Sequence, residues 1–201
     1  MGFYARHVLP RMLDFTMRQN VLRPFRERIA GAAEGRVLEI GLGSGLNLPL
    51  YGGNVSSVIG LEPSAELLRL ARRSAPAVAI EMMEGSAEAL PLEDRSVDTV
   101  VTTWTLCTIP DAGRALREAR RVLRPGGSLL FVEHGRAPEP GVARWQDRLD
   151  PIWCRVAGGC HLNRQIDALV REAGFRIDRL QTSRLPGPRT HTFLYEGRAA
   201  P

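Results

Sequence analysis

The segment that most constrains the fold runs from Val37 to Gly45 and reads Val-Leu-Glu-Ile-Gly-Leu-Gly-Ser-Gly. Apolar residues on both sides of Glu39 lead directly into glycines at every second position. This pattern predicts a buried strand that ends in a tight loop. Because glycine tolerates positive φ and lets a ligand approach the backbone, Gly41, Gly43 and Gly45 are expected to form a small-molecule site.

Further apolar and β-branched segments predict six more strands, at residues 57–62, 77–83, 97–103, 128–133, 175–181 and 191–196. Helices are expected between most of them, from Ser64 to about Arg73, from Asp111 to Leu123 and from Asn163 to about Ala173. Residues 135–162 are rich in Pro, Gly and Trp and are predicted to be irregular. The chain is therefore expected to be one α/β domain, residues 1–201. Its Rossmann-like seven-stranded sheet would be mostly parallel with an antiparallel last strand, and helices would cover both faces.

Residues 1–33 have apolar side chains at helical spacing with arginines between them and a break near Pro24. Three roles for this helical segment stay open: packing on the sheet, a lid over the site, or a basic face that touches a membrane surface. Residues 34–201 would form the catalytic core.

Composition excludes several classes of protein. The net charge is +5, but all 27 Lys and Arg residues are arginine, scattered and usually accompanied by acids, so nucleic-acid binding is not expected. No run of about 18 apolar residues predicts a membrane span, and charges interrupt any signal-peptide core. Three cysteines without a CxxC pair favour free thiols in a reducing compartment, which predicts a cytoplasmic protein.

The ends of the later strands indicate a nucleoside ligand. Glu62 ends the second strand, where its carboxylate can accept hydrogen bonds from two ribose hydroxyls, and Pro63 follows it. Ser86 and Ala87 follow the third strand, where an adenine ring would lie, and Thr103 ends the fourth. The carboxyl ends of parallel strands meet at one edge, so these residues are expected to converge.

The glycine loop distinguishes between two adenosine cofactors. A dinucleotide loop typically has G-x-G-x-x-G spacing, whereas this loop reads E-x-G-x-G-x-G. Glu39 would repel a pyrophosphate but would suit the ammonium group of a methionine moiety, directly or through water. The predicted cofactor is therefore S-adenosyl-L-methionine, with S-adenosyl-L-homocysteine as its product.

The chain resembles class I S-adenosylmethionine-dependent methyltransferases of the methyltransferase domain type 11 group. The resemblance covers residues 35–196 and is carried by four motifs: Val37 to Gly45, Gly60-Leu61-Glu62-Pro63, Glu84 to Pro91, and Arg121 to Gly127. It implies the seven-stranded fold and a methyl-transfer reaction. Many relatives have an acid at the position of Ser86, so adenine recognition is left partly to Ala87 or Glu88.

Segments between residues 100 and 162 are similar to methyltransferase-like proteins that methylate alkyl thiols. They are Trp104 to Ile109, Phe131 to His134, Trp145-Gln146-Asp147, Asp150 to Trp153, and Gly158 to Leu162. This similarity implies a small, apolar thiol as acceptor. Methylation of a quinone precursor or a phospholipid headgroup stays an alternative, as does a module that binds the cofactor without catalysis.

The acceptor side offers few candidates for catalysis. His134, which follows the fifth strand, is the predicted base, and His161 is a second candidate. Glu133 could orient His134 only if the turn brings them together. Trp104, Trp145 and Trp153 are expected to line an apolar acceptor pocket.

The cysteines are not predicted to be catalytic or to bind metal. Cys107 is expected to be a small buried hydrophobe. Cys154, Cys160, His161 and His134 do not have the spacing of standard zinc motifs, so no metal site is predicted.

Overall fold

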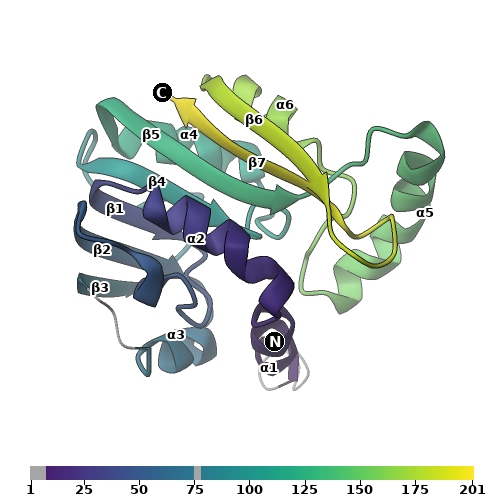
Figure 1. Ribbon diagram of the computed structural model, residues 1–201, viewed down its shortest axis with the longest axis horizontal. Coiled ribbons are helices and arrows are strands. Elements are labelled where there is room, and N and C mark those ends of the chain that lie inside the picture. Colours follow the sequence, from purple (N-terminus) through teal and green to yellow (C-terminus); the bar gives the residue numbers. More distant parts are fainter. Residues whose placement is uncertain (1–7, 75–77) are drawn as a thin grey trace.

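The computed structural model describes residues 8–74 and 78–201 and contains a seven-stranded sheet in the order β3-β2-β1-β4-β5-β7-β6 (Figure 1). The strands are β1 (Gly35–Ile40), β2 (Val55–Glu62), β3 (Ala79–Glu84), β4 (Val97–Thr103), β5 (Leu123–His134), β6 (Arg176–Arg184) and β7 (Phe193–Ala200). Strands β1 to β5 pair in parallel, whereas β7 pairs antiparallel with both β5 and β6. The predicted fold class is confirmed, including the antiparallel last strand. Residue 77 of the expected third strand lies outside the described residues.

Helices cover both faces of the sheet. They are α1 (Leu9–Met17), α2 (Arg23–Gly31), α3 (Ala65–Ala71), α4 (Ala112–Val122), α5 (Pro140–Val156) and α6 (Ile166–Glu172), with short 3-10 turns η2 (Asn20–Leu22) and η3 (Leu48–Leu50). In Figure 1, α2 crosses the front of the sheet, and α4 and α6 lie behind it. Pro24 stands in the first turn of α2, where its missing N–H costs nothing.

Alternate residues of the central strands feed two hydrophobic cores. On β5, Leu129 and Phe131 pack with the core beneath α4 and α6, and Leu130 and Val132 pack with the core beneath α2 and α3. All four side chains are essentially inaccessible to solvent. Burial on both faces explains why this strand reads as a continuous apolar run.

The prediction that residues 135–162 are irregular is wrong, because they contain the 17-residue helix α5. Pro140 lies in its first turn, which tolerates proline, and Pro151 lies inside the helix. Buried Gln146 fixes the helix, because its side chain bonds the backbone of Gly135, Ala137, Leu162 and Thr190. Within residues 8–74 and 78–201, no helix is both long and apolar enough to cross a membrane.

The strand order creates a switch point between β1 and β4. The chain runs from β1 outward to β3 and then crosses back to β4, on the other side of β1. In open α/β sheets, ligands bind outside the carboxyl ends of the strands at such a point. This edge therefore positions the candidate site.

Candidate cofactor and acceptor site

A cavity of about 550 Å³ opens at the carboxyl ends of β1, β2 and β4. This volume lies in the ordinary range for small-molecule sites. Most residues predicted to bind the cofactor line it, namely Gly41, Gly43, Glu62, Pro63, Ser86, Ala87 and Thr103. Glu39 and Gly45 do not line it.

The glycine loop after β1 adopts a backbone that only glycine accommodates without strain. Gly41 and Gly43 have φ of 73° and 59°. A Cβ atom on Gly41 would also collide with the side chain of Thr105. The loop therefore brings bare backbone to the cavity, as its sequence predicts.

Glu62 connects this loop to the end of β2. Its Oε2 accepts a hydrogen bond from the Gly43 amide and its Oε1 accepts one from the Ser64 amide, each at 3.0 Å. Burial raises the pKa of the Glu62 carboxyl, and these two amide bonds partly oppose that shift. Since a carboxylate oxygen can accept more than one hydrogen bond, both oxygens keep capacity for ligand hydroxyls.

Glu39 lies beneath the loop instead of on the cavity wall. It is 1% exposed, and its oxygens accept hydrogen bonds from Asn47 Nδ2 and Tyr51 OH, each at 2.8 Å. Burial raises the pKa of Glu39 to about 7, although both hydrogen bonds oppose this rise. The structure therefore gives Glu39 two side-chain partners beneath the cavity, and its contact with the ligand ammonium group, direct or through water, stays a prediction. Gly45 has a packing role, since a Cβ there would meet Leu48.

Arg26, which sequence reasoning missed, projects from α2 into the cavity wall. Its Nη1 donates to Asn47 Oδ1 at 3.0 Å and to Thr103 Oγ1 at 3.4 Å, and its guanidinium lies 4.9 Å from the Trp104 ring centroid. Arg26 is 7% exposed, and burial lowers its pKa to about 10. One arginine among many carries no sequence signal that marks it as buried.

The N-terminal segment contributes directly to the cavity. Leu13, Asp14 and Met17 of α1 line it together with Arg26. Residues 1–7 of the predicted segment lie outside the described residues. Elsewhere on the cavity wall, Ser86 Oγ accepts a hydrogen bond from the Glu88 amide, and both residues line the wall.

Of the three tryptophans predicted to form an acceptor pocket, Trp104 lines the cavity. It has a φ of 51°, a left-handed conformation that is uncommon for a bulky residue and often marks a functional position. Trp145 is 56% exposed and stacks with Arg148, and Trp153 packs against His191. Neither of these two residues lines the cavity.

The histidine candidates lie behind the wall. His134 Nε2 is 2.9 Å from Cys160 Sγ, and His161 Nδ1 is 2.8 Å from Asp150 Oδ2. Neither histidine is among the cavity-lining residues. Glu133 accepts hydrogen bonds from the amides of Thr105 and Leu106 and makes none with His134 in the part of the chain that the structure describes.

Burial raises the pKa of Glu133 to about 7, against the effect of the bonds that it accepts. These bonds fix the turn after β4, so Glu133 positions the backbone beside Trp104. Within the described residues, the turn does not bring Glu133 into a hydrogen bond with His134, so these contacts do not support a role for Glu133 in orienting that histidine.

Comparisons with known proteins agree with this geometry. A family model described as "Methyltransferase domain" matches residues 38–131. Human thiol S-methyltransferase TMT1B is 34% identical over 164 residues, which cover 78% of this chain and 66% of that protein. The match to the rat protein of the same name covers 35% of that protein's length. Phosphatidylethanolamine N-methyltransferase of Cereibacter sphaeroides is 34% identical over 149 residues, which cover 68% of this chain and 73% of that protein.

The fold also matches solved structures. The methyltransferase in complex with the Haloferax volcanii Trm112 methyltransferase activator superposes with a TM-score of 0.72 over 98% of this chain and 96% of that one, at 20% identity. The glycine loop after β1, the acid Glu62 at the end of β2 and the similar proteins all indicate the same family. The chain belongs to the S-adenosylmethionine-dependent methyltransferases.

Proposed function

We propose that this protein transfers the methyl group of S-adenosylmethionine to the sulfur of a small, apolar thiol. The observation that carries the proposal is the composition of the cavity wall. Its titratable side chains are Asp14, Arg26, Glu62 and Glu88, and no histidine, tyrosine or cysteine is among the lining residues that the structure describes. A thiol suits such a wall because it is partly ionised near neutral pH and needs little help from a base.

The described residues fit the cofactor. Glu62 has hydrogen-bonding capacity for the ribose hydroxyls, and Ser86 and Ala87 line the same cavity and would hold the adenine. Arg26 offers its guanidinium to the methionine carboxylate, and the Glu39 charge favours the ammonium group through the electric field instead of by contact. When bound, S-adenosylmethionine supplies a methyl group that its sulfonium already activates.

The cavity wall offers apolar side chains to an acceptor. Leu13, Met17, Trp104 and Ile109 are among them. These groups exclude water and align the sulfur for in-line displacement, which is the main requirement of this reaction. The positive charge of Arg26 beside Trp104 stabilises a thiolate over the thiol.

The test is an acceptor panel with methyl-labelled S-adenosylmethionine. We expect label in the thioether formed from an alkyl thiol and none in the ether of the alcohol with the same carbon skeleton. Glu62→Ala, purified in parallel, controls for contaminating enzymes and should lose the activity. Turnover of the alcohol and the thiol at equal rates would contradict the proposed choice of sulfur.

Phosphatidylethanolamine is the second candidate acceptor, because the Cereibacter sphaeroides relative carries that activity in its name. Vesicles that contain this lipid form one further arm of the panel, and a hydroquinone forms another. Label in the lipid or in the quinone, with none in the thiol, would overturn the thiol proposal. Binding of S-adenosylhomocysteine by calorimetry without label in any arm would favour a non-catalytic binding module.

A further inference from the structure

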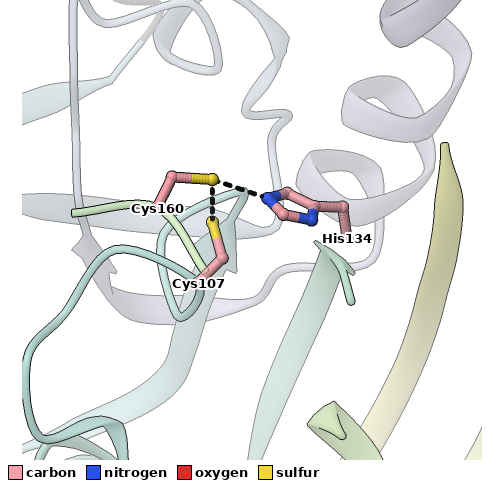
Figure 2. Close-up of side chains that lie close together, drawn as sticks. All are labelled: Cys107, His134 and Cys160. Carbon is pink, nitrogen blue, oxygen red and sulfur yellow. Dashed lines mark hydrogen bonds between the residues drawn. The ribbon is translucent and has the colours of Figure 1, made fainter. Parts of the chain in front are cut away.

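Three potential metal ligands lie close together, as Figure 2 shows, and none of them lines the cavity. Cys107 comes from the turn after β4, His134 from the end of β5, and Cys160 from the turn after α5. Cys160 Sγ is 2.9 Å from His134 Nε2 and 3.8 Å from Cys107 Sγ. All three ligand atoms lie within 4.8 Å of one another. Spacing along the sequence cannot reveal this cluster, because its members are separated by 27 and 26 residues.

The geometry is close to that of a zinc site. With Zn–S bonds of about 2.3 Å, two thiolates on a tetrahedral ion lie about 3.8 Å apart, which matches the sulfur–sulfur distance here. The nitrogen–sulfur pair would have to widen by about 0.6 Å to reach the corresponding tetrahedral separation. Thiolate and imidazole ligands together favour zinc over magnesium or calcium.

The backbone already holds the three segments together. The His161 amide donates to the Cys107 carbonyl at 2.8 Å, and the Trp104 amide donates to the Val132 carbonyl at 2.8 Å. Cys107 is buried, whereas His134 and Cys160 are only partly buried. The backbone therefore preorganises the three ligands.

We propose that Cys107, His134 and Cys160 bind one Zn²⁺ ion. Both cysteines bind as thiolates, so their two protons pass to solvent, and the neutral imidazole binds through Nε2. Three protein ligands leave a fourth position for water or another small ligand. Trp104, Thr108 and Gly159 belong to the same segments and line the cavity. The bound ion would therefore hold this part of the cavity wall in place.

A disulfide between Cys107 and Cys160 is the competing explanation. It would require the sulfurs to approach from 3.8 Å to about 2.05 Å. It would leave His134 without a role, whereas the zinc site uses all three side chains. The metal proposal does not depend on the identity of the methyl acceptor.

The test uses the full chain, reduced and stripped of metal, and titrated with zinc chloride against a chromophoric chelator. We expect one zinc per chain and, with cobalt chloride, the intense visible absorption of a tetrahedral thiolate site. Cys107→Ser, Cys160→Ser and His134→Gln should each weaken zinc at least tenfold. Cys154→Ser is the matched control and should bind zinc like the wild type, because Cys154 lies outside the cluster.

Circular dichroism and S-adenosylhomocysteine binding check that each variant is folded. If Cys160→Ser unfolds, His134→Gln decides, since it preserves both thiols. No zinc retained by the reduced wild type, or equal affinity in the wild type and the folded cluster variants, would overturn the proposal. A mass decrease of two hydrogens mapped to Cys107 and Cys160 in the reduced-and-reoxidised protein, without zinc binding before oxidation, would establish the disulfide instead.

Discussion

Among single residues, Glu62 joins the glycine loop to the cavity, because it bonds the Gly43 amide and lines the cavity wall. We predict that Glu62→Ala weakens S-adenosylhomocysteine by roughly 1–3 kcal/mol, the usual cost of lost hydrogen bonds to a charged group. Isothermal titration calorimetry measures this change. Glu84→Ala is the control, since Glu84 pairs in register with Glu62 but is exposed and does not line the cavity. Unchanged affinity in Glu62→Ala would refute the ribose assignment.

Glu39 should make stability depend on pH. Its pKa of about 7 in the folded protein exceeds its ordinary value of 4.5, so the folded state holds its proton more tightly than the unfolded state does. Stability from this group is thus lost as the pH rises from about 4.5 to 7, by about 3 kcal/mol at most. Urea unfolding of the wild type and Glu39→Gln across this range measures the difference. We expect Glu39→Gln to lose less stability than the wild type as the pH rises. Parallel plots of stability against pH for the two proteins would contradict a raised pKa of Glu39.

These residues also mark how far sequence reasoning reaches. Gly41, Gly43 and Glu62 were predictable because backbone conformation and strand-end position are local properties. The hydrogen-bond partners of Glu39 were not predictable from local sequence. Asn47 and Tyr51 reach its side chain only because of the path that the glycine loop and η3 take. Arg26 and the Cys107–Cys160 contact likewise depend on packing between distant segments.

At the scale of elements, the strands were easier to predict than the helix α5. Strand β4 has the predicted bounds, 97–103, because every residue in it except Asp98 is β-branched. Residues 135–162 contain the helix breakers Pro140, Gly141 and Pro151, so local sequence favours a loop there. Tertiary contacts override this preference, as buried Gln146 bonds backbone groups on both sides of α5 along the chain. Local rules cannot anticipate such a bridge.

Helix α1 should respond to the cofactor, since Leu13, Asp14 and Met17 form part of the cavity wall. We predict that S-adenosylhomocysteine lowers hydrogen–deuterium exchange in α1, because closing a wall element over a ligand protects its amides. Mass spectrometry of the peptide covering residues 9–17 measures the effect. The edge strand β6 serves as the internal control and should exchange equally with and without ligand. Protection of the glycine loop with no change in α1 would argue against a lid.

At the scale of the whole molecule, exposed apolar side chains gather on two helices beside the cavity. Val8, which caps α1, recurs at helical spacing with Met12 and Phe15 of that helix, and Trp145, Ile152 and Val156 do so on α5. The two helices are linked in space, because a Cβ on Gly158, just after α5, would lie 2.7 Å from Leu9. Exposed arginines at positions 11, 18, 148 and 155 accompany these side chains. An apolar stripe with basic neighbours is typical of helices that bind membrane surfaces.

We therefore predict that the protein binds vesicles containing anionic phosphatidylglycerol and that binding weakens as salt rises, since arginine attraction is screened. Phe15→Glu and Ile152→Glu should each reduce cosedimentation several-fold, because each puts a carboxylate where an apolar side chain would enter the lipid. Gln181→Glu on β6 makes the same change of charge away from both helices and should bind like the wild type. If all three variants lost cosedimentation equally, net charge alone would explain the binding. If none of them lost it, neither helix would be the membrane-binding surface. Apolar thiols and phospholipids both concentrate in the lipid phase, so docking through α1 and α5 would bring the cavity to its acceptor.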